Sequence, residues 1–102
     1  MTATLYLPQQ SPQTVSAEGL VLPDPATRLA RVSAEVPILL GCAPELVDIL
    51  TTGPSFVAYS IYDSEGEVNP AAMEAVAQVS GVSFDLEDED AVLRGAVLLV
   101  TE

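Results

Sequence analysis

The segment PSFVAYSIYD, residues 54–63, restricts the fold more than any other part of the chain. It is rich in β-branched and aromatic residues, which are typical of a β-strand. Successive side chains of a strand point to opposite faces, and both faces of this strand would be largely apolar. One face carries Val57, Tyr59 and Ile61, and the other carries Phe56, Ala58, Ser60 and Tyr62. The segment therefore predicts a strand in the centre of a sheet.

A second clear pattern, NPAAMEAVAQVSG, predicts a helix over residues 69–81. Asn69 is a favourable N-cap, Pro70 fits the first helical position, and Gly81 ends the helix. The inward face would carry Met73, Val76, Ala77 and Val79. This helix must pack its apolar side on the rest of the domain.

Other elements are expected from shorter signals. APELVDILTTG predicts a helix over 43–53, because Pro44 can start it, Gly53 can end it and the leucines and isoleucine share one face. Strands are expected at residues 4–7, 82–86 and 96–102 from their runs of apolar and β-branched residues.

The segment DPATRLARVSAEVP, residues 24–37, fits two structures. As a helix it would have Asp24 as its N-cap and an apolar stripe of Leu29, Val32 and Val36. As a strand it would place alternate residues from 30 to 38 on one apolar face. The capping residues favour the helix, and Pro37 is expected to end either structure.

Residues 1–26 contain four prolines and a polar stretch without helical periodicity, which predicts an extended N-terminal arm. Residues 27–102 would then form the compact domain, and a chain of 102 residues fits one domain. The expected fold is α+β: a small single domain with two or three helices packed on a short mixed or antiparallel sheet, preceded by the arm.

The composition is strongly acidic. The chain has fifteen Asp and Glu residues and three arginines, with no lysine and no histidine, for a net charge of −12. Nucleic acids and anionic membranes are bound through clustered Lys and Arg, so neither is an expected partner. No apolar run approaches the roughly 20 residues of a spanning helix, and the N-terminus does not resemble a signal peptide. We therefore expect a cytoplasmic or virion location, without secretion by a signal peptide.

Catalytic patterns have no support in this sequence. Without histidine or lysine, no conventional base can activate a serine, a threonine or the single cysteine, Cys42. Neither a phosphate-binding loop nor a dinucleotide-binding motif is present. The sequence predicts a protein that is not an enzyme and uses no cofactor.

Residues 61–72 partly resemble an EF-hand calcium loop when Gly66 is set at its central glycine position. Ile61 and Ala72 then occupy the first and last ligand positions, where oxygen ligands are needed. Two missing ligands remove most of the coordination shell, so an acidic turn followed by a capped helix is the preferred interpretation and no metal is expected.

Together these features predict a non-enzymatic structural or accessory subunit of a larger assembly, with protein partners or copies of itself in a homo- or hetero-oligomer. A small domain with an arm is similar in architecture to minor virion proteins of tailed phages, such as decoration or neck components. The arm would contact neighbours through apolar residues: Leu5, Leu7, Leu20 and Leu22.

An acidic inhibitor or DNA mimic that binds a basic partner is the alternative. Its binding surface would come from the acidic run at the end of FDLEDED: Asp85, Glu87, Asp88, Glu89 and Asp90. A run of this kind is more often a solvated loop, although charge complementarity can also dock a basic protein on it.

Overall fold

The computed structural model describes residues 1–24, 26–27, 29–62, 66–81, 84 and 92–102. Within them the chain forms a five-stranded antiparallel sheet with strand order β2-β1-β5-β4-β3. The strands are β1 (Thr2–Tyr6), β2 (Gln13–Val15), β3 (Val47–Gly53), β4 (Phe56–Ile61) and β5 (Val97–Thr101). The helices are α1 (Glu35–Leu40), α2 (Pro70–Ser80) and the short 3-10 helix η1 (Pro44–Leu46). The α+β class and the antiparallel sheet are confirmed.

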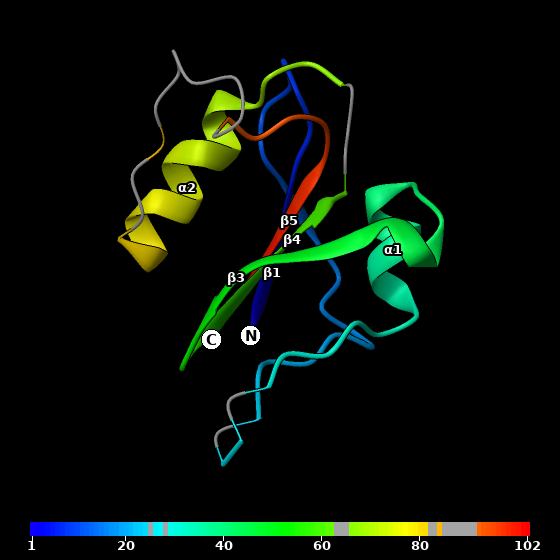
Figure 1. The fold of residues 1–102 in the computed structure, drawn as a ribbon, viewed down its shortest axis with the longest axis vertical. Helices are drawn as coiled ribbons and strands as arrows, with labels where there is room; N and C mark the ends of the chain where they lie inside the picture. Colours follow the sequence, from blue (N-terminus) through cyan, green and yellow to red (C-terminus); the bar gives the residue numbers. More distant parts are fainter. Residues whose placement is uncertain (25, 28, 63–65, 82–83, 85–91) are drawn as a thin grey trace.

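The sheet is covered on both faces, with α1 on one side and α2 on the other (Figure 1). On the α1 side, Val36 and Leu40 belong to a buried cluster with residues of three strands: Ala3, Leu5, Val57, Tyr59, Leu98 and Val100. On the α2 side, Met73 and Val76 pack with the opposite face of the two central strands: Phe56, Ala58, Val97 and Leu99. The sheet is thus the middle layer of three.

The central strand predicted at residues 54–63 is confirmed as β4, which pairs with β3 on one side and β5 on the other. Its residues from Phe56 to Ser60 are all buried. The strand expected at 96–102 is confirmed as β5, in which Val97 to Val100 are buried. Apolar residues on both faces of these two strands are the reason that each face needs a helix.

The N-terminal residues do not form the extended arm that their prolines suggested. Residues 2–6 form β1, which lies inside the sheet between β2 and β5, and Ala3 and Leu5 are buried. The proline-containing stretch 8–12 is only the connection between two paired strands, with a bond from the Gln10 N–H to the Leu7 carbonyl. The boundary expected between residues 26 and 27 therefore does not separate the first strand from the domain.

The prediction of a helix over residues 43–53 is wrong. Pro44 starts only the single turn η1, and β3 follows as the edge strand beside β4. The consecutive Ile49 and Leu50, which suggested one helical face, reach opposite sides of the sheet: Ile49 pairs with Tyr59, and Leu50 packs on the α2 side. Pairing with β4 outweighs the local helical signals, as is common for short segments.

Neither the helix nor the strand expected for residues 24–37 spans the described part of that segment, in which only residues 35–37 are helical. Asp24 caps a turn and not a helix: its Oδ1 accepts from the Ala26 N–H at 2.8 Å. Helix α1 begins only at Glu35, and Pro37 lies in its first turn, where the missing N–H has no helical partner to lose. The strand expected at 82–86 falls mostly outside the described residues.

Helix α2 is confirmed with its predicted caps, and its N-cap residue has a wider role. Asn69 is 1% exposed, and its Oδ1 accepts from the Ala72 N–H. Its side-chain amide donates to the carbonyls of Tyr6, at 3.0 Å, and Gly95, at 2.8 Å. One side chain therefore fixes the start of α2 to the end of β1 and to the residues that lead into β5.

We expect Asn69→Ala to lower the free energy of unfolding by about 3 kcal/mol or more, because each buried polar group left unpaired costs about 1–3 kcal/mol. Asn69→Asp keeps the oxygen that caps α2 but loses both donated bonds, so it should also be destabilising. Urea denaturation measures both. Gln78→Ala, at an exposed position of the same helix, should stay within about 0.5 kcal/mol of wild type. A loss below 1 kcal/mol for Asn69→Ala would contradict this role.

Candidate functional site

A concave apolar groove of about 550 Å³ lies beside α1. It is larger than two other hollows, of about 320 Å³ next to α2 and about 290 Å³ near Asp24. Its walls come from the chain just before α1, from α1 itself and from the residues after it: Val32, Ser33, Ala34, Pro37, Ile38, Cys42 and Pro44. Pockets of about 300–1,000 Å³ are of the size that binds ligands.

One wall of the groove is built by the end of α1. Gly41 has the left-handed backbone conformation (φ 75°). The Cys42 N–H donates to the Pro37 carbonyl at 3.1 Å, and the Gly41 N–H donates to the carbonyls of Ile38, at 3.3 Å, and Pro37, at 2.8 Å. This is the Schellman arrangement that commonly closes helices with glycine. It brings Cys42 and Pro44 back alongside the helix. Because Val36 and Leu40 take the core side of α1, Ile38 is left 70% exposed.

The other wall is held by a hydrogen bond from the sheet. The hydroxyl of Tyr59, a residue of β4 that is 1% exposed, donates to the Arg31 carbonyl. This bond fixes the backbone immediately before Val32 and Ser33, which line the groove. Burial raises the pKa of the Tyr59 phenol, so the donating proton is retained well above neutral pH.

Ser33 carries the most unusual polar group of the groove. Its Oγ is buried and has no hydrogen-bond partner among the described residues. A buried hydroxyl without a partner costs about 1–3 kcal/mol, and native proteins contain few such groups. The Ser33 carbonyl, in contrast, accepts from the Val36 N–H at 3.1 Å. The free hydroxyl is therefore a hydrogen-bonding group that the fold itself leaves unused.

Cys42 lines the groove as a free, half-buried thiol. Burial raises its pKa, and the carboxylate of Glu45 raises it further. Since the thiolate is the reactive form, both effects make this thiol a poor nucleophile. The chemistry at this position is that of a small apolar side chain.

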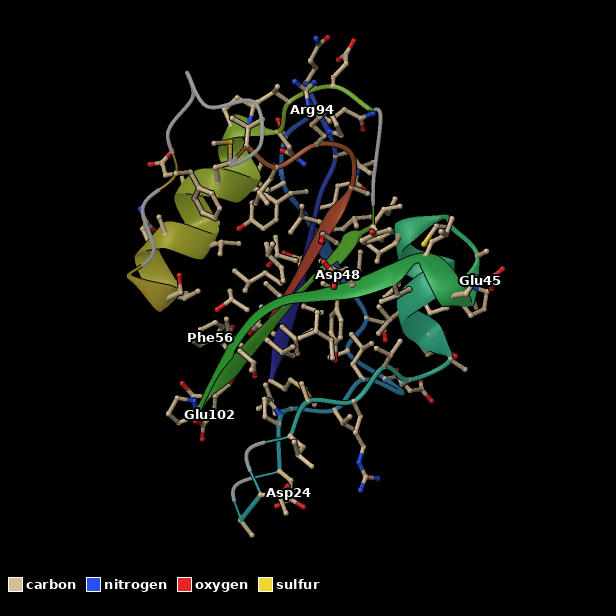
Figure 2. All side chains as sticks on the ribbon, viewed as in Figure 1. Asp24, Glu45, Asp48, Phe56, Arg94 and Glu102 are labelled. Carbon is tan, nitrogen blue, oxygen red and sulfur yellow. The ribbon has the colours of Figure 1, made fainter. Side chains whose placement is uncertain are left out.

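The charges next to the groove are acidic. Glu45 is exposed and close enough to act on the Cys42 thiol, and Figure 2 shows it at the surface beside α1 and well away from Arg94. Among the described cations, Arg31 lines the separate hollow that contains Asp24, and Arg94 donates to the Gly66 carbonyl. The described residues that line the groove include no Arg.

The residues predicted to bind partners are placed elsewhere or lie outside the described residues. Leu5 and Leu20 are in the core, 7% and 4% exposed, and Leu7 and Leu22 are partly buried against the same cluster. Burial in the fold accounts for these four leucines without a partner. The acidic positions Asp85, Glu87, Asp88, Glu89 and Asp90 lie outside the described residues. None of the four leucines is among the described residues that line the groove.

The groove itself was not predicted from the sequence. Val32 and Ser33 were assigned to a helix or a strand, and Ile38 was assigned to the apolar face of the strand alternative. Irregular chain followed by a six-residue helix leaves no clear periodic signal in the sequence.

In the described part of the chain, no cluster of three or more Cys, Asp or Glu side chains is arranged to hold a metal ion. Of the two critical positions in the EF-hand comparison, Ile61 ends β4 and Ala72 is buried in α2. Among the described helices, none has the length and apolar character needed to cross a bilayer.

No protein-family model matches the chain, and no curated protein or solved structure is significantly similar to it.

We expect the hydrogen bond from Tyr59 to stabilise the fold at neutral pH and to be lost at alkaline pH. The raised pKa means that, above about pH 10, the unfolded chain loses the phenolic proton while the folded chain keeps it. Stability conferred by this group is thus present below pH 10 and falls as the pH rises. Tyr59→Phe should cost about 1 kcal/mol at pH 7, with the difference from wild type shrinking towards pH 11.

Urea denaturation at several pH values from 7 to 11 measures this convergence. Tyr62→Phe, at a position that is 65% exposed, is the matched control and should leave the stability nearly unchanged. A difference between wild type and Tyr59→Phe that stays constant over the whole range would contradict the assignment.

The rate of Cys42 alkylation by iodoacetamide should rise with pH at a midpoint above that of the urea-unfolded chain. Glu45→Gln should lower this midpoint, because it removes the negative charge that disfavours the thiolate. The midpoint should still exceed the unfolded value, since burial is the larger cause. Glu74→Gln, on α2, should leave it unchanged. An unaltered midpoint in Glu45→Gln would place that carboxylate away from the thiol.

Proposed function

We propose that the chain is a non-enzymatic structural or accessory subunit of a larger assembly and that it binds a protein partner through the groove beside α1. The observation that carries this proposal is the concave apolar surface with an exposed isoleucine. Apolar side chains exposed together in this way are typical of interaction sites.

The exposure of individual residues supports the same surface. Ile38 and Val32 are 70% and 41% exposed and both line the groove, and Leu46, just beyond Pro44, is 40% exposed. By contrast, the apolar side chains of β4 and β5 are buried almost completely. The central strands thus bury their apolar side chains, whereas the region beside α1 leaves several at the surface.

The proposal differs from the sequence-based hypothesis in the device that makes the contact. Residues 2–6 and 13–15 are paired as strands of the sheet, so this part of the chain is not the free arm that the hypothesis required. The architectural analogy with decoration or neck proteins of tailed phages rested on that arm. We therefore propose the assembly role without a particular type of particle.

Affinity purification of the tagged full-length chain from its source cells tests the proposal. We expect a stoichiometric protein partner that is retained in 0.5 M salt, because raising the salt from about 0.1 to about 1 M shortens the Debye length from about 10 to about 3 Å but leaves apolar contacts intact. Ile38→Glu should abolish the interaction. Val79→Glu, which makes the same change at an exposed position of α2, should preserve it.

A chain that is monomeric and purifies without a stoichiometric partner would contradict the assembly role. A partner that is released at 0.5 M salt and is indifferent to Ile38→Glu would point to the other hypothesis, an acidic inhibitor held by charge alone.

A further inference from the structure

We propose that the partner enters the groove with a short segment that carries an aliphatic side chain next to Lys or Arg. This inference rests on the proposed function and specifies the chemistry of the partner. The segment belongs to a protein other than this chain.

The shape and lining of the groove select the apolar part of that segment. Val32, Pro37, Ile38 and Pro44 present hydrocarbon, and the Cys42 thiol is held protonated and uncharged in their midst. Only an apolar side chain gains from contact with such a surface. The volume of about 550 Å³ exceeds that of one side chain, so adjacent backbone enters as well.

Electrostatics select the flanking residues and disfavour a second copy of the chain. Glu45 lies beside the groove, the described residues that line the groove include no cation, and the net charge is −12. A segment with Lys or Arg beside the apolar anchor is attracted to this face, which raises its association rate. Two copies would bring like charges together across the contact, because a two-fold interface repeats the same patch on both sides.

Selection from a random library of 12-residue displayed peptides, on the immobilised full-length chain, tests this inference. We expect the enriched sequences to share an aliphatic residue next to Lys or Arg. A synthetic peptide of the enriched sequence, labelled with a fluorophore, then gives dissociation constants by fluorescence anisotropy for the wild-type chain and its variants.

Two variants separate the two parts of the proposal. Ile38→Glu should weaken peptide binding at least tenfold by placing a charge at the apolar anchor. Glu45→Lys should weaken binding and flatten its salt dependence, and Glu74→Lys on α2 should change it much less.

Enrichment of acidic or purely polar peptides, or of peptides whose binding ignores both Ile38→Glu and Glu45→Lys, would overturn the inference. So would the absence of any enriched sequence, which would leave the groove to a small apolar molecule. These outcomes are independent of the test of the proposed function. A stoichiometric partner together with a peptide selection that fails refutes only the groove chemistry, whereas selective peptides without any partner refute the assembly role.

Discussion

The buried amide of Asn69 is the contact on which the relative placement of the elements depends. It joins three segments that are distant in the sequence: the end of β1, the residues before β5 and the first turn of α2. Apolar burial supplies most of the driving force for folding, but it is not directional and tolerates sliding. A fully satisfied buried polar group has one geometry, so it fixes the register that apolar packing alone would leave open.

The groove depends on the core in a similar way. The Tyr59 ring belongs to the buried cluster on the α1 side, while its hydroxyl holds the backbone at Arg31 that leads to Val32 and Ser33. A segment without regular structure thus obtains a fixed position from a strand residue. Binding sites held by rigid elements lose less conformational entropy when a partner binds, and this is the advantage of attaching an irregular wall to the central sheet.

The sequence predicted the elements whose signals are local and strong. β4 and β5 follow from apolar residues on both faces, and α2 follows from Asn69, Pro70 and Gly81 at its ends. β3 was mistaken for a helix because Pro44 does start a helical turn, and only pairing with β4 makes the following residues a strand. The strand expected at residues 4–7 is present as β1, but the prolines after it led to its assignment to an arm and not to the sheet. The groove could not be predicted, since its walls meet only through the turn at Gly41 and the bond from Tyr59.

The strand order has a consequence for how the molecule is made. β1 and β2 form one hairpin and β3 and β4 another, but the two hairpins join only through β5, which is the last of the five strands in the sequence. Until β5 emerges during synthesis, the inner edges of both hairpins lack a partner. Unpaired edges of this kind are prone to join other chains. The five-stranded sheet is therefore complete only once β5 lies between β1 and β4, and this pairing joins residues distant in the sequence, a kind of contact that forms slowly.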